Sequence, residues 1–226
     1  MQNYALQFPF LKQFDFIEHY FFIQHLPVEG SAIYDFANVL ELPVFEYGSV
    51  NQIHSGHVFL FEENPSYEPD GDGIVTAIPN LWIGVHVADC APVYLIDTLN
   101  RVIAVIHCGW RPISEEIIEN TLALMAEKFG SAPSEIFAYI GPTIQYSDYE
   151  IGPEIAHHFH ESSIIQKSEK IYLDIPNEIE FRLMRIGVKG DGIDKFPLST
   201  FSEPAFCSYR RDGVGVLPMT AVVKLK

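Results

Sequence analysis

Three short segments of the chain are rich in side chains that can hold a metal ion or act as nucleophiles. One contains His54, one contains Cys90, and the third runs from His107 through Cys-Gly-Trp to Arg111. A cysteine and a histidine in contact can bind zinc when a third ligand joins them. Two imidazoles with one thiolate leave a fourth position open, as in catalytic zinc sites. Without a metal, the cysteine and histidine can form a nucleophilic thiolate–imidazole pair, or a buried thiol beside a half-buried histidine that does no chemistry.

Cys90 and His107 flank a predicted β-hairpin. Val93 to Asp97 and Val102 to His107 are rich in β-branched residues, and the segment between them, Thr98 to Arg101, is typical of a hairpin turn. A hairpin brings the start of its first strand beside the end of its second, so we expect Cys90 and His107 to be neighbours. The local sequence does not place His54 relative to them.

Helices and further strands are expected around this hairpin. From Ser114 to Phe129 apolar residues recur at helical spacing, Ser114 can cap the first turn, and Gly130 is suited to end the helix. We also expect a strand at 136–140, helices near 153–161 and 176–186, and one or two strands within 214–225. Strands and helices alternate only in part and the hairpin is antiparallel. We therefore predict an α+β (mixed α/β) fold, a single compact domain over residues 1–226 with mixed β-sheets between helices.

The composition excludes several classes of protein. The chain has 14 Lys and Arg against 30 Asp and Glu, a net charge of −16, which argues against nucleic-acid binding. A few arginines would still suffice for a small anionic substrate. We find neither an apolar stretch of about 18–20 residues nor a signal peptide, so no membrane partner is expected. Three cysteines are an odd number and favour free thiols, so we predict a soluble cytoplasmic protein. The sequence does not fix its oligomeric state.

Several blocks of the sequence resemble the YfiH-like family. The segment His107 to Arg111 before a helix, with Val87 to Val93 upstream, carries the resemblance. Members of this family have been described as laccase-domain (multicopper polyphenol oxidoreductase) proteins, peptidoglycan editing factors and purine nucleoside phosphorylases. Further blocks follow in family order and extend the resemblance over about Gln52 to Asp212: Gln52-Ile53-His54, Asp72 to Thr76, Gly141-Pro142 with Tyr149-Glu150, and Ser208 to Arg211.

The resemblance implies both a fold and a site. It implies a compact α/β domain with mixed sheets, akin to the catalytic domain of a bacterial cytotoxic necrotising factor. It also implies a zinc site on His54, Cys90 and His107, with Arg111 and Arg210 in the pocket. Arg111 could hold phosphate or another oxyanion, or form a plain salt bridge.

The residues around these blocks add to the implied site or depart from it. Asp89 could orient a ligating imidazole or merely cap its turn, and of the neighbouring Arg210 and Arg211 we expect one to be solvated. The chain departs from the family pattern after Arg211, where Gly-Val-Gly-Val-Leu-Pro replaces the usual Thr-Gly-Arg ending. Substrate detail near this end is therefore not implied by the resemblance.

We expect zinc rather than copper at this site. Blue-copper sites add a weak axial ligand, usually methionine, and the four methionines lie in none of the three segments. A four-copper oxidase would need several His-x-His pairs, and only His158 and His160 form one. The histidines at 157, 158 and 160 are expected to be solvated.

The predicted function is that of a zinc-dependent purine nucleoside phosphorylase. The resemblance implies phosphorolysis of adenosine, inosine and methylthioadenosine, with adenosine deaminase as a side activity. Zinc would activate phosphate or water, and Arg111 or Arg210 would offset the phosphate charge. The alternatives are a peptidoglycan-precursor amidase, a copper-dependent polyphenol oxidoreductase, a metal-free cysteine hydrolase, and a non-catalytic module whose metal takes His57 or His86 as a fourth ligand.

Overall fold

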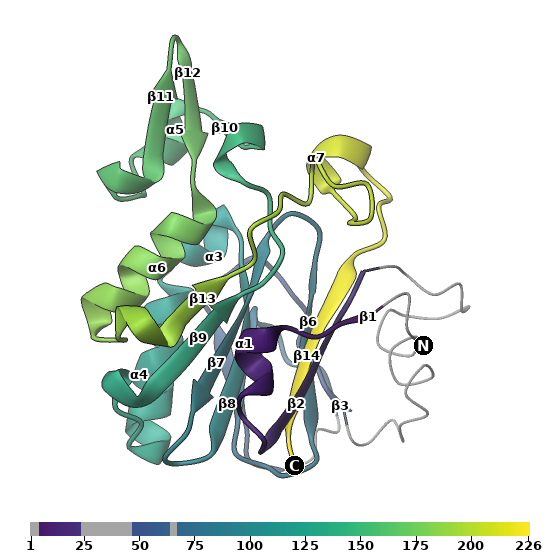
Figure 1. Cartoon of the computed structure of the whole chain (residues 1–226), viewed down its shortest axis with the longest axis vertical. Helices are drawn as coiled ribbons and strands as arrows, with labels where there is room; N and C mark the ends of the chain where they lie inside the picture. Colours follow the sequence, from purple (N-terminus) through teal and green to yellow (C-terminus); the bar gives the residue numbers. More distant parts are fainter. Residues whose placement is uncertain (1–4, 24–46, 64–66) are drawn as a thin grey trace.

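The computed structural model describes residues 5–23, 47–63 and 67–226 of the chain. Three β-sheets organise these residues (Figure 1). A five-stranded sheet has the order β1 (Ala5–Leu6), β2 (Ile17–Phe22), β14 (Met219–Leu225), β6 (Trp82–Val87) and β3 (Tyr47–Gly48). A six-stranded sheet has the order β13 (Ile193–Lys195), β9 (Ile136–Ile140), β7 (Ala91–Asp97), β8 (Val102–Cys108), β5 (Gly73–Thr76) and β4 (Val58–Phe61).

The third sheet and the helices complete the described structure. The third sheet has the order β10 (Glu150–Ile151), β12 (Lys170–Leu173) and β11 (Ile164–Lys167), and it projects from one end of the molecule (Figure 1). The described helices are α1 (Pro9–Lys12), α3 (Trp110–Ser114), α4 (Ile117–Phe129), α5 (Pro153–Ala156), α6 (Ile175–Ile186) and α7 (Tyr209–Asp212). Parallel and antiparallel pairs occur together in the two larger sheets, so the predicted mixed α/β class is confirmed.

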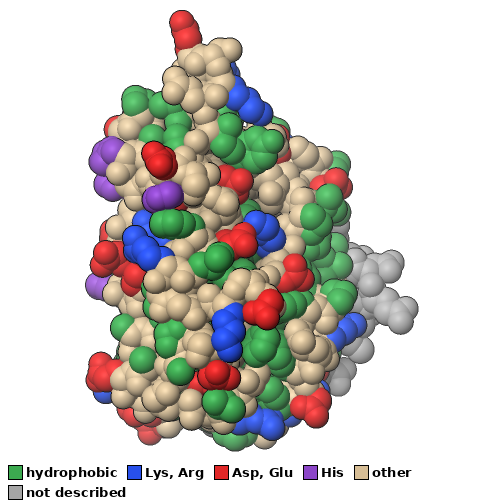
Figure 2. All heavy atoms as spheres, turned by 60° about the vertical axis from the view of Figure 1, so that its left-hand side comes forward, with side chains coloured by type: hydrophobic (Ala, Val, Ile, Leu, Met, Phe, Trp, Pro, Cys, Tyr) green, Lys and Arg blue, Asp and Glu red, His purple; other side chains and the backbone are tan. Residues whose placement is uncertain are grey.

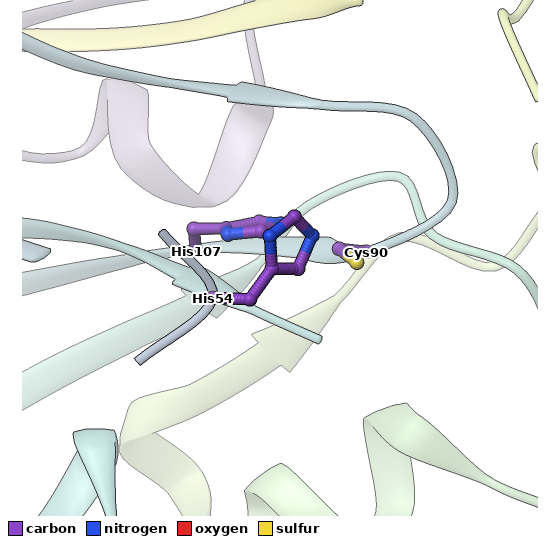
Figure 3. Close-up of side chains that lie close together, drawn as sticks. All are labelled: His54, Cys90 and His107. Carbon is purple, nitrogen blue, oxygen red and sulfur yellow. The ribbon is translucent and has the colours of Figure 1, made fainter. Parts of the chain in front are cut away.

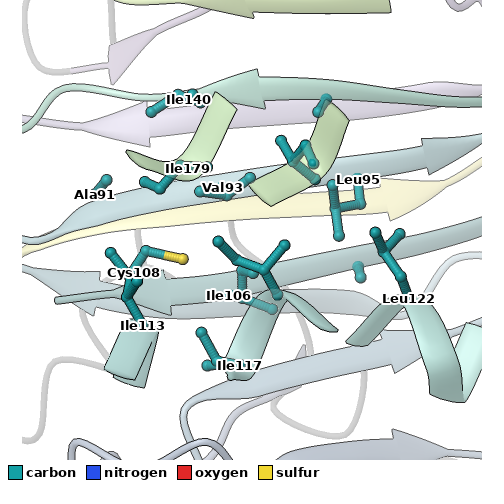
Figure 4. Packing of buried hydrophobic residues seen from close by; sticks show 14 of the residues in the cluster. Ala91, Val93, Leu95, Ile106, Cys108, Ile113, Ile117, Leu122, Ile140 and Ile179 are labelled. Carbon is teal, nitrogen blue, oxygen red and sulfur yellow. The ribbon is translucent and has the colours of Figure 1, made fainter. Parts of the chain in front are cut away.

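The central strands of the six-stranded sheet are buried on both faces. Successive side chains of a strand point to opposite faces. Val93 and Leu95 of β7 pack with helices α3, α4 and α6, whereas Tyr94 and Ile96 pack toward the five-stranded sheet. Figure 4 shows the helix-side layer. The described residues therefore form two large cores, one between the two larger sheets and one between the six-stranded sheet and its helices, and a smaller cluster on the five-stranded sheet around Trp82.

The predicted hairpin is confirmed, and the strand alternation assigns different roles to two adjacent residues. β7 and β8 are antiparallel, with Pro92 opposite His107. Cys108 is fully buried in the helix-side core (Figure 4), so its neighbour His107 points to the other face. This alternation separates the thiol of Cys108 from the imidazole of His107.

The helix predicted from Ser114 to Phe129 is divided in two. α3 ends at Ser114 and α4 begins at Ile117, with Glu116 between them at a left-handed φ of 64°. Ser114 therefore does not cap α4, and the side chain of Glu116, which holds the cap position, makes no capping bond. Gly130 ends α4 with a φ of 70°, as expected.

The remaining elements occur where they are predicted, two with nearly the predicted bounds and two with shorter ones. The strand at 136–140 is β9, and α6 ends at Gly187, which has a φ of 114°. The helix expected near 153–161 is only α5, which ends at Ala156. The tail at 214–225 forms one strand, β14, between β2 and β6. Within the described residues, none of the helices has the length and apolar character needed to cross a membrane.

Candidate metal centre and its cleft

Three side chains from separate segments meet at one end of the β7–β8 hairpin. His54, Cys90 and His107 each offer one ligand atom, and these atoms all lie within 4.8 Å of one another (Figure 3). Ligands of one tetrahedral zinc ion lie about 3.3–3.8 Å apart, so a small adjustment would bring the three atoms around a shared ion. The structure brings together the three predicted ligand residues; their binding of a metal stays a prediction.

The hairpin positions two of the three side chains. β8 carries His107 opposite Pro92, and Cys90 lies immediately before β7. The expected neighbourhood of Cys90 and His107 is thereby confirmed. His107 is buried, with 3% exposure, whereas Cys90 is half-buried and His54 is exposed. The three donors thus form a site that is open on the side of His54.

A tight loop positions His54, which adopts a left-handed backbone with a φ of 59°. The main-chain N–H groups on both sides of it, at Ile53 and Ser55, donate to Oδ2 of Asp72 at 3.2 and 2.6 Å. Gly56 then packs into the break between α3 and α4, where its N–H donates to Glu115 Oε2 at 3.0 Å. A β-carbon on Gly56 would lie 2.0 Å from the Glu115 carbonyl oxygen, so only glycine fits there.

Asp72 connects two of the three donor residues. Its Oδ2 holds the His54 loop, and its Oδ1 accepts from Nδ1 of His107 at 2.8 Å. A carboxylate on one ring nitrogen leaves the other, Nε2, for a metal. Sequence reasoning did not give Asp72 this role. The signal for it is register: Gly73 pairs with Ile106, so Asp72 lies beside His107.

The sequence leaves two roles open to Asp89, orienting an imidazole or capping its turn, and the contacts of its carboxylate are with the C-terminal segment rather than with a histidine. Its carboxylate accepts hydrogen bonds from Thr200 Oγ1 at 2.6 Å, from Ser208 Oγ at 3.0 Å and from the main-chain N–H of Arg210 at 2.7 Å. Asp89 therefore joins the turn before Cys90 to the C-terminal segment of the chain. The carboxylate that orients an imidazole is that of Asp72.

The side chains of the donor cluster shift one another's pKa values. Burial alone would lower the pKa of His107, but the charge of Cys90 and the hydrogen bond to Asp72 raise this pKa to about 9. Burial raises the pKa of Asp72, while the bonds from His107 and Ser55 lower it by more, so the net pKa is lowered. The pKa of His54 is lowered, mainly by burial and by His107. The anionic groups of Cys90 and Asp72, beside His107, therefore favour a positive charge at the ring of His107.

The three donors open into a cleft of about 600 Å³. Arg111 and Arg210 both line it, as do three aromatic residues, Trp110, Tyr149 and Tyr209. The Arg111 guanidinium lies over the Trp110 ring at 4.2 Å, and that of Arg210 lies over Tyr149 at 5.1 Å. Among the residues that the structure describes, no carboxylate forms an ion pair with Arg111 or Arg210. The cleft therefore offers cationic groups to an anionic ligand.

The neighbouring arginine, Arg211, has a structural role. Its guanidinium donates to the carbonyl oxygens of Thr200, Phe201 and Phe206 at 2.7–3.1 Å, and it pairs with Asp212. Because Arg211 fixes the loop beneath α7, Arg210 is the arginine of this pair that faces the cleft. Arg210 also donates from Nη1 to the carbonyl of Glu150 at 3.1 Å.

The other histidines and the methionines lie apart from the donor cluster. His86 lines the cleft, but its Nδ1 contacts Thr220 Oγ1 at 3.0 Å. His157, His158 and His160 are exposed and follow the end of α5. Within residues 5–23, 47–63 and 67–226, a single group of three metal-binding side chains occurs. Met125 and Met219 are buried in the two cores, Met184 is exposed, and Met1 lies outside the described residues.

On the face shown in Figure 2, basic and acidic side chains are interspersed. This face therefore carries no continuous basic stripe of the kind that binds nucleic acid.

Comparison with known proteins places the chain in a family. A family model described as multi-copper polyphenol oxidoreductase laccase matches residues 32–226, and the chain belongs to this YfiH-like family. A protein of Clostridium acetobutylicum named purine nucleoside phosphorylase is 32% identical over 175 residues, covering 75% of this chain and 73% of that protein. A protein of the same name from Deinococcus radiodurans is 31% identical over 184 residues, covering 80% and 70%.

Solved structures show the same fold. The YfiH protein of Bacillus licheniformis superimposes with a TM-score of 0.89 at 21% identity, covering 99% of this chain and 97% of that one. The Neisseria meningitidis protein NMB0706 superimposes with a TM-score of 0.83 at 24% identity, covering 100% of both chains. The mixed-sheet architecture is therefore that of the family.

Proposed function

We propose that the protein is a zinc-dependent purine nucleoside phosphorylase. The substrates proposed are adenosine, inosine and methylthioadenosine, which phosphate would convert to a free purine and a pentose 1-phosphate. Relatives about 30% identical bear this name. The observation that carries the proposal is the cleft, in which a metal donor set and two arginines without described acidic partners line one volume.

The donor set fits zinc. Two imidazoles and a thiolate are borderline-soft ligands that zinc accepts, and three protein ligands leave one position for a reactant. His54, Cys90 and His107 would hold the ion, with the Asp72 bond fixing the His107 tautomer. Zinc bound there would supply a Lewis acid that lowers the pKa of an oxygen nucleophile.

The arginines and an aromatic ring of the cleft fit the two reactants. A guanidinium presents a planar fork of donors that matches phosphate, so Arg111 and Arg210 would bind and orient the phosphate. The exposed ring of Tyr209, over which no guanidinium of the described residues lies, offers an apolar face for a purine. In the reaction a phosphate oxygen forms a bond to C1′ of the pentose, the C1′–N9 bond breaks, and the base leaves with the electron pair and takes up a proton.

The same cleft supports a proposed side activity, the deamination of adenosine. Here water adds to C6 of the adenine ring, ammonia leaves, and inosine is formed. The open side of the donor cluster, at exposed His54, favours this activity because a small nucleophile can reach it without displacing a side chain. Release of ammonia from adenosine in phosphate-free buffer would test it.

The test of the main proposal is phosphorolysis by the purified full chain. With one equivalent of zinc and inosine in phosphate buffer, we expect hypoxanthine and ribose 1-phosphate in equal amounts, and a loss of turnover when a chelator removes the metal. His54→Ala should abolish the activity, whereas the matched control His57→Ala, at an exposed residue outside the donor group, should retain it. Unchanged inosine would refute the proposal.

Other outcomes would identify the alternatives. Release of a free amino acid from a UDP-muramoyl peptide without phosphate would indicate a peptidoglycan-precursor amidase. Oxidation of a phenol by the copper-loaded protein would indicate a polyphenol oxidoreductase. Turnover without any metal would indicate a cysteine hydrolase, and unfolding on chelation with no turnover would indicate a structural metal.

A further inference from the structure

Asp89 lies at a junction of four segments of the chain. It is buried, with 7% exposure, has a left-handed φ of 81°, and directly precedes Cys90. Its carboxylate binds Thr200, Ser208 and Arg210, and its carbonyl oxygen accepts from Thr143 Oγ1 at 2.6 Å and from Ile144 N–H at 3.0 Å. A non-glycine residue holds such a backbone only where its surroundings fix it, and such residues cluster at functional sites.

We propose that Asp89 is a positioning residue that sets Arg210 in register with Cys90. The inference rests on the proposed function, in which Arg210 binds phosphate beside the metal ligands. Consecutive Cα atoms are about 3.8 Å apart, so the turn that carries the Cys90 thiol also carries the anchor of Arg210. Asp89 would thereby hold the backbone of Arg210, which binds phosphate, at a fixed distance from the metal ligand Cys90.

The contacts of Arg210 show how the anchor acts. Its main-chain N–H donates to Asp89 Oδ2, and Ser208, which donates to the same oxygen, caps the start of α7 by accepting from Arg211 N–H at 3.1 Å. The Arg210 guanidinium then extends over the Tyr149 ring and reaches the Glu150 carbonyl. Asp89 thus fixes the backbone from which this side chain starts.

A charged carboxylate suits this position because all its partners donate. Thr200 and Ser208 donate hydroxyl protons and Arg210 donates its N–H, so three donors converge on two oxygens. An asparagine would turn an NH₂ group toward one of these donors and lose that bond. Asp89→Asn therefore changes the hydrogen bonding with almost no change in volume.

The main experiment compares Asp89→Asn with Asp97→Asn. Asp97 is a matched control: it is also buried, lies at the other end of β7, and accepts from the N–H groups of Leu99 and Asn100 at 2.9 and 3.0 Å. In Asp89→Asn we expect the KM for phosphate to rise about tenfold, with the KM for inosine and the zinc content within about twofold of wild type. Asp97→Asn should be destabilised and keep the wild-type KM for phosphate.

A double-mutant cycle with Arg210→Ala separates positioning from a general loss of structure. If Asp89 acts through Arg210, adding Asp89→Asn to Arg210→Ala should not raise the KM for phosphate further. If the two substitutions raise the KM for phosphate by factors that multiply in the double mutant, the proposal is refuted. Loss of zinc from Asp89→Asn would also refute it, because Asp89 would then act on Cys90 and not on Arg210. Should Asp89→Asn not fold, Ser208→Ala removes one of its donors and should raise the KM about threefold, with rescue by Ser208→Thr.

Binding of inorganic phosphate to the zinc-loaded protein, measured by calorimetry, gives a readout that needs no turnover. The positioning role is supported if Asp89→Asn and Arg210→Ala each weaken phosphate binding and the double mutant binds phosphate no more weakly than Arg210→Ala. This result supports the role even if inosine is not cleaved. Absence of turnover in the wild type would refute the proposed function alone. Wild-type phosphate affinity in Asp89→Asn would refute the positioning role alone.

Discussion

At the scale of single residues, Asp72 is the group on which two of the three donor residues depend. One oxygen fixes the ring of His107 and the other fixes the loop of His54. Carboxylates that orient a ligating histidine contribute strongly to metal affinity. Asp72 is fully buried, so its charge is satisfied only by these neighbours.

Replacing Asp72 should weaken metal binding without removing a ligand. Asp72→Asn turns an NH₂ group toward either His107 or the His54 loop, and we expect the zinc affinity to fall about 10- to 100-fold, as measured by competition with a chromophoric chelator. The control is Asp70→Asn, at an exposed aspartate two positions away whose Oδ1 accepts from Asn51 Nδ2 at 2.7 Å. Wild-type affinity in Asp72→Asn would show that the His107–Asp72 bond does not contribute to zinc binding.

The site residues differ in how far the sequence can locate them. A single hairpin places Cys90 beside His107, so local pattern suffices for that pair. His54 depends on Asp72 and on the docking of Gly56, contacts between residues far apart in the sequence that periodicity does not encode. The sequence likewise does not show that Asp72, rather than Asp89, orients an imidazole, because both lie just before strands and only the register of the sheet tells them apart.

At the scale of elements, the break between α3 and α4 serves the site. The apolar spacing from Ile118 to Phe129 is helical, and the residues before it contain no glycine at the break, so the sequence predicts one helix. The break instead accommodates the loop at Gly56, and Asn120 donates to the carbonyls of Gly56 and Glu115 at 2.9 and 3.2 Å. Tertiary contact thus overrides local helix propensity at this point.

Glycine at the break should stabilise the protein. Glu116 has a φ of 64°, which is unfavourable for a residue with a β-carbon, and its side chain is exposed. We expect Glu116→Gly to raise the free energy of unfolding by about 0.5–1 kcal/mol, measured by urea denaturation. The control, Ala123→Gly at an exposed position in the middle of α4, should lower it by about 1 kcal/mol. A loss of stability in Glu116→Gly would mean that the Glu116 side chain contributes more than its backbone strain costs.

At the scale of the whole molecule, His19 connects the N-terminal segment to the core between the two larger sheets. It lies on β2 with 2% exposure, and its Nε2 accepts from the N–H of Phe8 at 2.8 Å. Burial, with a contribution from Lys12, lowers its pKa to about 4. The native protein therefore holds this imidazole neutral at pH values where an unfolded chain protonates it.

His19 should make stability dependent on pH. The unfolded histidine titrates at about 6.5 and the folded one near 4, so its contribution is complete above pH 6.5 and is lost as the pH falls toward 4, by about 3 kcal/mol at most. His19→Gln should reduce the loss of unfolding free energy between pH 6.5 and pH 4. His157→Gln, at an exposed residue, should leave the pH dependence of the unfolding free energy as in the wild type. A slope unchanged in His19→Gln would show that other groups cause it.

The mixed α/β fold class follows from the sequence, because strand-like and helix-like patterns alternate only in part. The two larger sheets, which contain both parallel and antiparallel pairs, confirm this class. The order of strands within the sheets does not follow from it. Nothing local pairs β14 with both β2 and β6, or β13 with β9, since each pairing joins residues far apart in the sequence.

The place of β14 has a consequence for how the protein is made. This strand, the last of those described, lies in the middle of the five-stranded sheet and bridges the earlier strands β2 and β6. While the ribosome is still synthesising residues 219–225, the earlier strands have emerged with an unfilled gap between them. During translation the edges of β2 and β6 in the five-stranded sheet therefore stay exposed until β14 is made. Exposed strand edges are sites for chaperone binding and for wrong pairing between nascent chains. The six-stranded sheet, and with it the cysteine and histidines, can assemble sooner.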